Sequence, residues 1–110
     1  MNTEVLIDEK IEQVISTPDH FKVIFLNDDH TPMDFVIDVL VSIFKHSKDT
    51  ARDLTMQVHK EGSAIVGVYT YELAEQKSIE ATTVSRQHSY PLQIRVRKNE
   101  FKRINIRTSP

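Results

Sequence analysis

The stretch FLNDDHTPMDF, residues 25 to 35, gathers an amide, two carboxylates, an imidazole and a hydroxyl between two apolar segments. Asn and Asp side chains stabilise turns, so turn chemistry alone could account for several of these residues. Two adjacent carboxylates repel each other, however, and exceed what one turn requires. Asp28 and Asp29 therefore also favour a cationic ligand, which could be a metal ion, a basic side chain or an amine.

The sequence lacks the usual patterns of metal sites and of catalysis. A calcium loop needs acidic residues at alternating positions and a Gly at the sixth, and NDDHTP has neither. The five histidines form no zinc pattern such as His-Glu-x-x-His. A chain with two glycines contains no nucleophile elbow, P-loop or dinucleotide fingerprint. We expect no catalytic residues, no metal and no cofactor, and we interpret the chain as a binding module.

Length and composition indicate one small globular domain. The chain has 110 residues, 39% of them hydrophobic, no cysteine and a formal net charge of -2. This length fits a single core. The absence of cysteine and of a signal-like or membrane-spanning run predicts a cytoplasmic protein without a membrane partner. The charge is uneven, with acidic residues near the N-terminus and basic residues near the C-terminus, but the net value gives no case for nucleic acid.

The elements that position the polar cluster follow from periodicity. The segment FKVIFLN alternates as a strand, and Thr31 and Pro32 are suited to start a helix that runs to about His46. A second helix spans about residues 48–61 and stops at Gly62. Residues 63–70 form a strand, residues 71–88 a helix and residues 92–97 a half-buried strand. The prediction is an α+β fold in the order β-α-α-β-α-β, with three strands in an antiparallel sheet against three helices.

We divide the chain into three parts. Residues 1–19 are polar, end in a turn-rich stretch and predict a mobile N-terminal arm with a short helical piece. Residues 20–98 form the domain. Residues 99–110 form a basic C-terminal tail.

Three segments together resemble the ClpS family, the adaptors that recognise N-degrons for the ATP-dependent Clp protease. They are NDDHTPMDFVIDVL, QVHKEGSAIVGVYTYELAEQK and YPLQIRV, in the family's order and spacing over about residues 21–97. The resemblance implies an adaptor without enzymatic activity. Such an adaptor binds the first residue of a substrate, Leu, Phe, Tyr or Trp, and delivers the substrate to a ClpA-type AAA+ unfoldase with ClpP. We expect it to act as a monomer.

The resemblance also implies which residues bind the substrate. The free α-amino group would be held by Asn27, Asp29 and His59, with Asp28 close to the same site. The pocket for the first side chain would be lined by Thr31, Met33, Val36, Thr55, Val58 and Leu92. Thr55 departs from the family, in which a larger Met is usual at that position.

Physical chemistry agrees with this assignment. An α-amino group has a pKa of about 7.7 to 8.0, so at neutral pH it is mostly a cation with three N–H donors. Carboxylates, an amide oxygen and a neutral imidazole offer the acceptors that it needs. An ammonium therefore explains the polar cluster that turn chemistry explains only in part.

Two other functions remain open at this point. The basic C-terminal strand and tail could serve a nucleic-acid or ribosome-associated module, whose binding would weaken steeply with salt. Asp28, Asp29 and His59 could also serve a metal-dependent hydrolase.

Overall fold

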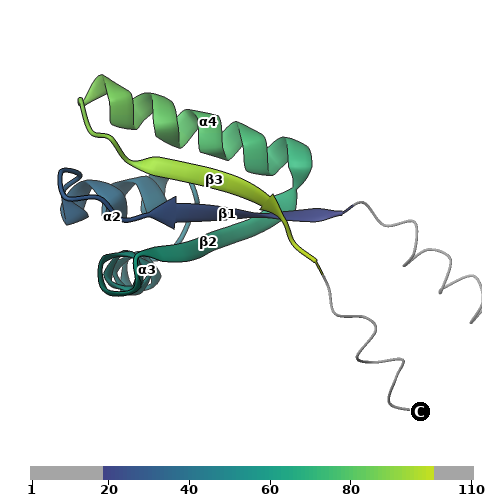
Figure 1. Ribbon diagram of the computed structural model, residues 1–110, viewed down its shortest axis with the longest axis horizontal. Coiled ribbons are helices and arrows are strands. Elements are labelled where there is room, and N and C mark those ends of the chain that lie inside the picture. Colours follow the sequence, from purple (N-terminus) through teal and green to yellow (C-terminus); the bar gives the residue numbers. More distant parts are fainter. Residues whose placement is uncertain (1–18, 101–110) are drawn as a thin grey trace, which may run out of the picture.

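The protein is described by a computed structural model that covers residues 19–100. The expected arm, except for its last residue, and most of the expected basic tail lie outside the described residues. The elements follow in the order β1 (His20–Leu26), α2 (Met33–Ser42), α3 (Lys48–Glu61), β2 (Ser63–Thr70), α4 (Tyr71–Gln87) and β3 (Gln93–Lys98). This order confirms the predicted α+β fold (Figure 1).

The strands form one antiparallel sheet in the order β2-β1-β3, with β1 in the centre. β1 pairs with β2 along its whole length and with β3 from Phe21 to Leu26. A register shift between Val23 and Ile24 accommodates one extra residue of β2, Val66. The central position of β1 means that the polar residues after Leu26 leave the sheet from its middle.

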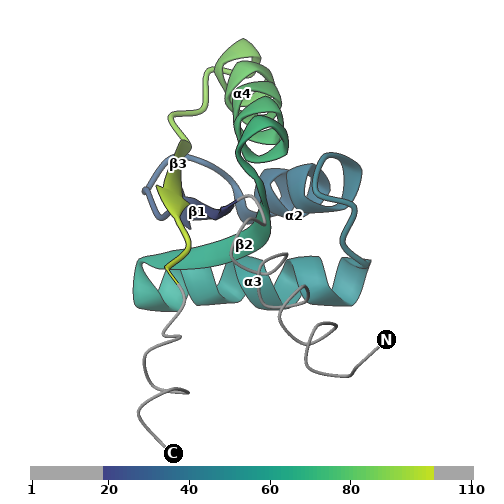
Figure 2. The same cartoon turned by 90° about the vertical axis from the view of Figure 1, so that its right-hand side faces the viewer.

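One face of the sheet is buried by the helices. α4 contacts all three strands, α3 contacts β2, and α2 packs on α3 (Figure 2). The buried apolar residues of the core are Val23, Phe25, Val36, Val39, Leu40, Phe44, Ala51, Val58, Ala64, Val66, Ala74, Ala81 and Leu92. The Phe25 and Phe44 rings meet edge to face with centroids 5.4 Å apart, so β1 is fixed against the segment that follows α2.

Two details of α2 differ from the prediction. The helix ends at Ser42 and does not continue to about His46. Lys45 adopts a left-handed conformation (φ 61°), and the His46 N–H donates to the Leu40 carbonyl at 3.1 Å. This backbone bond closes the helix end without a glycine.

The predicted cap at Thr31 is also wrong. Pro32 occupies the N-cap position, with φ -66° and ψ 145°, and no side chain caps the helix. The Thr31 hydroxyl donates instead to the carboxylate of Asp28. A residue that was expected to start α2 therefore belongs to the turn before it.

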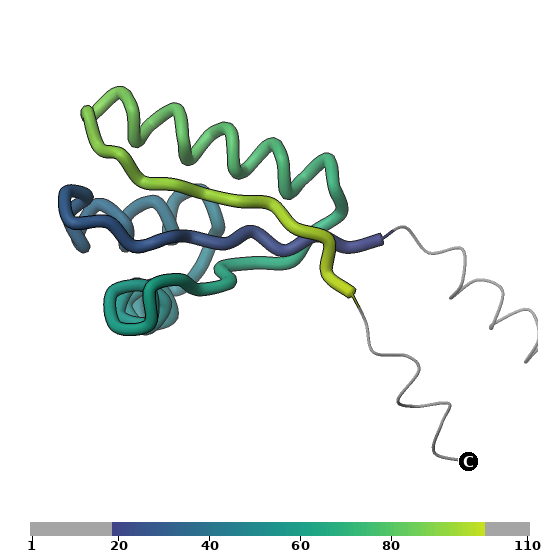
Figure 3. The backbone as a smooth tube through the Cα atoms, viewed as in Figure 1, coloured from purple at the N-terminus to yellow at the C-terminus, as the bar shows by residue number. Residues whose placement is uncertain are grey.

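The ends of β1 and α3 are tied together. Gly62 ends α3 in the left-handed region (φ 93°), as predicted, and its N–H donates to the Val58 carbonyl at 2.9 Å. The Asn27 N–H donates to the Gly62 carbonyl at 2.9 Å. Figure 3 shows the end of β1, the start of α2 and the whole of α3 at the same end of the sheet. The polar cluster is thereby held beside two helices.

Candidate functional site

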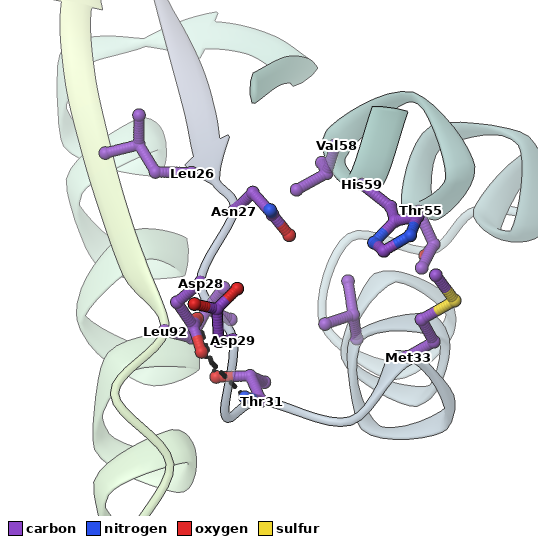
Figure 4. A pocket seen from close by; sticks show the side chains of 11 residues that line it. Leu26, Asn27, Asp28, Asp29, Thr31, Met33, Thr55, Val58, His59 and Leu92 are labelled. Atoms are coloured by element: carbon purple, nitrogen blue, oxygen red, sulfur yellow. Dashed lines mark hydrogen bonds between the residues drawn. The ribbon is translucent and has the colours of Figure 1, made fainter. Parts of the chain in front are cut away.

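A pocket of about 210 Å³ opens where β1, α2 and α3 meet (Figure 4). It is lined by Leu26, Asn27, Asp28, Asp29, Thr31, Met33, Val36, Thr55, Val58, His59 and Leu92. All ten residues that the sequence singled out are among them. The volume is below the roughly 300 Å³ at which sites for drug-sized ligands begin, so a single amino-acid residue suits it better than a larger ligand.

Asp28 organises the turn that forms one wall of the pocket. Its Oδ1 accepts from the His30 N–H at 2.8 Å and from the Thr31 N–H at 2.7 Å. Its Oδ2 accepts from the Thr31 hydroxyl at 2.8 Å. These bonds make an Asx-type turn between β1 and α2. Both carboxylate oxygens of Asp28 are therefore used inside the loop.

The same contacts set the charge of Asp28. Burial raises its pKa, but hydrogen bonds from the Thr31 backbone, the Thr31 hydroxyl and the His30 backbone, with the charge of His30, lower it by more. The net result is a pKa below the ordinary value of 3.8. Asp28 is thus anionic at neutral pH and adds negative potential to the loop.

Asp29 differs from its neighbour. It is exposed, and among residues 19–100 its carboxylate forms no hydrogen bond or ion pair. Asn27 and His59 are exposed as well, and Figure 4 shows their side chains directed toward the same open space. Three polar groups that are exposed in the described part of the chain thus lie around the mouth of the pocket.

The interior of the pocket is apolar. Val36 from α2 and Val58 from α3 are each 5% exposed, and Leu92, directly before β3, is 1% exposed. Met33, the first residue of α2, is 37% exposed and lies at the opening. The site therefore combines a polar, anionic rim with a buried apolar floor.

Residues 16–95 match the family described as ATP-dependent Clp protease adaptor protein ClpS. The chain belongs to the ClpS family. An ATP-dependent Clp protease adapter protein ClpS from Treponema denticola is 44% identical over 88 residues, which is 80% of this chain and 87% of that protein. One from Escherichia coli is 41% identical over 92 residues, 84% of this chain and 87% of that protein.

A solved ClpS structure has the same fold. The structure of Agrobacterium tumefaciens ClpS2 bound to L-phenylalaninamide superposes with a TM-score of 0.73 and 40% sequence identity. The match covers 76% of this chain and all of that one. ClpS proteins are adaptors of the Clp protease and not enzymes, so the prediction of a binding protein without enzymatic activity is confirmed.

Thr55 is the buried polar residue of this ClpS pocket. It is 3% exposed, and its hydroxyl donates to the Ala51 carbonyl at 2.7 Å within α3. Because the hydroxyl is used inside the helix, it does not require a partner on the ligand. Thr55 therefore contributes a small side chain to the pocket wall where a longer one would take up space.

Leu26 is the lining residue that the sequence did not assign to the ClpS site. It is the last residue of β1 and directly precedes Asn27. Figure 4 shows its side chain pointing away from the other pocket residues. Strand alternation gave no signal for it, since Leu26 shares a face with Ile24 and not with the buried Phe25.

Within residues 19–100, no group of three or more His, Asp and Glu side chains is arranged to hold a metal ion. No helix in the same range is long and apolar enough to cross a membrane.

Proposed function

We propose that this ClpS protein binds the first residue of substrate proteins that begin with Leu, Phe, Tyr or Trp. The proposal rests on one observation: a single pocket has an exposed polar rim and a buried apolar floor. A residue at a chain's N-terminus differs from every other residue because it offers an ammonium and a side chain together. A site with both halves can distinguish it from internal residues.

The ammonium is assigned to Asn27, Asp29 and His59. Asp29 supplies the carboxylate that has no partner among the described residues, and Asn27 supplies an amide oxygen. Hydrogen bonds to charged groups contribute about 1.5 to 3 kcal/mol, more than bonds between neutral groups. Asp28 supports this contact through the turn and through its negative charge.

The first side chain is assigned to the apolar floor. Burying a Leu or Phe side chain contributes roughly 1.5 to 3 kcal/mol. Met33 lies at the opening, where a side chain branched at Cβ would meet it, so Ile and Val are poor first residues. The ClpS2 neighbour, which is bound to L-phenylalaninamide, supports an aromatic residue with a free amine as the ligand.

Delivery is assigned to a ClpA-type AAA+ unfoldase acting with ClpP, with the adaptor as a cytoplasmic monomer. The family description, an adaptor of an ATP-dependent Clp protease, supports a partner of this class. We also propose that residues 1–19 serve as the segment that the unfoldase engages. The first residue of the domain, His20, starts β1, whereas the pocket lies beside Leu26 at the other end of this strand. The point at which the arm joins the domain is therefore remote from the proposed substrate site.

The test is a binding titration with short peptides that differ only in their first residue. Peptides with Leu, Phe, Tyr or Trp should bind, and those with Ile, Val, Gly or Glu should not. Acetylating the amine of the best peptide removes the charge and leaves polar groups unpaired, so its affinity should fall by roughly tenfold or more. Equal affinity for the free and acetylated peptides would refute the ammonium assignment. Absence of any first-residue preference would refute the proposal as a whole.

A further inference from the structure

The face of the sheet that the helices leave uncovered carries an apolar band beside a row of basic side chains. Ile24 pairs with Ile65 across β1 and β2, and Val68 lies further along β2 on the same face. Ile65 is 48% exposed and Val68 is 44% exposed. No helix of the described chain crosses this face (Figures 1 and 2). Such a band on an uncovered face of a sheet indicates an interaction surface.

The basic row consists of Arg95 and Arg97 on β3 and Lys22 on β1. Arg95 pairs with Ile24 and Arg97 pairs with Lys22, so all three basic residues share the face with the apolar band. Both arginines are exposed, and neither forms an ion pair with a described residue. Within the three strands, no position on this face carries a carboxylate. A complementary partner is therefore apolar and acidic.

The sequence of residues 1–18 has this chemistry. It contains Glu4, Asp8, Glu9 and Glu12 against one lysine, together with Val5, Leu6, Ile7, Ile11, Val14 and Ile15. At helical spacing, Ile7, Ile11 and Val14 share a stripe, and Asp8 and Glu12 flank it on one side. An apolar stripe with one acidic flank matches an apolar band with one basic flank.

The link between this segment and β1, and the length of the segment, are also compatible with docking on the sheet. Residues 16–19, Ser-Thr-Pro-Asp, are turn-forming and join this segment directly to β1. A helix over residues 4–15 would be about 18 Å long at ~1.5 Å per residue. The seven residues of β1 extend about 23 Å at ~3.3 Å per residue. The segment can therefore double back over the strand that it precedes.

We propose that residues 4–15 dock on the open face of the sheet over Ile24, Ile65 and Val68, with their acidic flank toward Arg95 and Arg97. A second copy of the chain fits the face less well, because it would set two rows of arginine against each other. The C-terminal residues 101–110 fit it less well because they are basic. The contact is weak and salt-dependent, since exposed ion pairs are screened.

The test uses paramagnetic broadening in the full chain. The sequence has no cysteine, so Gln13→Cys gives a single attachment point for a nitroxide. At low salt, the label should cause loss of the methyl signals of Ile24, Ile65 and Val68 while the methyl signals of Ala74 and Ala81 in α4 remain. Raising the ionic strength from about 0.05 M to about 0.5 M should restore the lost signals. Uniform intensities across the domain at low salt would overturn the proposal.

Two controls test whether the basic residues cause the broadening and whether the docked segment belongs to the same chain. Arg95→Glu with Arg97→Glu should restore the signals, whereas Arg52→Glu with Lys60→Glu, the same charge change on exposed positions of α3, should not. If the β3 pair leaves the broadening intact, the charge match is wrong and the proposal fails. In a mixture of spin-labelled chain and isotope-labelled chain, broadening of the second chain would show a second copy on the face and would equally overturn the proposal.

Discussion

Replacing Asp28 separates the two ways in which a carboxylate can support an ammonium site, directly or by shaping the loop. Asp28→Ala removes the acceptors of three hydrogen bonds, from the His30 N–H, the Thr31 N–H and the Thr31 hydroxyl. A net hydrogen bond contributes about 0.5 to 1.5 kcal/mol, and the lower end applies to this half-exposed turn. The ordered loop then loses roughly 1.5 kcal/mol of stabilisation, which corresponds to an affinity about twelvefold lower if binding must restore that order.

Asp28→Asn is the matched variant. Its amide oxygen can still accept from the two backbone N–H groups, and its NH2 group can donate to the Thr31 oxygen. The turn survives, and only the charge is lost. We therefore expect affinity for a peptide with an N-terminal Phe to fall by no more than about threefold. Asp29 should behave differently, since Asp29→Asn and Asp29→Ala both remove the charge that we propose contacts the ammonium, and both should lower the affinity roughly tenfold.

The assay is a titration of a fluorescent peptide with an N-terminal Phe against the four variants, with circular dichroism to verify that each domain is folded. Equal losses of tenfold or more for Asp28→Asn and Asp28→Ala would refute the reasoning, because the charge of Asp28 would then act on the ligand directly. A large difference between Asp29→Asn and Asp29→Ala would refute the complementary role of Asp29.

Four further results are expected. Met33→Ala should admit peptides that begin with Ile or Val in the same titration, since it removes the side chain at the opening. Thr55→Met should weaken binding of a peptide with an N-terminal Trp by roughly tenfold and leave binding of an N-terminal Leu little changed, because the longer Met side chain takes up space in the pocket. Thr55→Val, which keeps the side-chain size, should leave the binding of both peptides unchanged. Deleting residues 2–17 should leave peptide affinity within about twofold and abolish unfoldase-dependent degradation of an N-terminal Phe reporter. The free energy of unfolding, measured by denaturant unfolding, should fall as the pH is lowered from about 5 to 2, and this fall should be smaller in Asp28→Asn. The reason is that the pKa of Asp28 is lowered in the folded state, so its carboxylate stabilises the fold above the pKa of the unfolded chain and stops doing so as the pH falls through the pKa of the folded state.

The fold could be predicted because local signals and apolar periodicity agree along most of the chain. Gly62 marks the end of α3, and the alternation of Leu92, Ile94 and Val96 marks β3. The end of α2 could not be predicted from the same signals. Lys45 takes the left-handed position that a glycine usually occupies, and the next residue, His46, places its Nε2 2.6 Å from the Val66 carbonyl of β2. That contact is tertiary and leaves no local pattern.

Apart from Leu26, the residues that line the pocket could be predicted from the sequence, but the separate contribution of each residue could not. Asn27, Asp28 and Asp29 are adjacent in the sequence, and their types alone allowed both a turn and a cationic ligand. Only the hydrogen bonds distinguish the two aspartates, since Asp28 completes the turn and Asp29 is exposed without a partner among the described residues. A carboxylate that is held by its own loop can fix the direction of its neighbour, and a neighbour without internal bonds can meet a ligand without first giving them up. Under the proposed function, the two aspartates meet two separate requirements, one for geometry and one for charge, and the four-variant titration tests each of them independently.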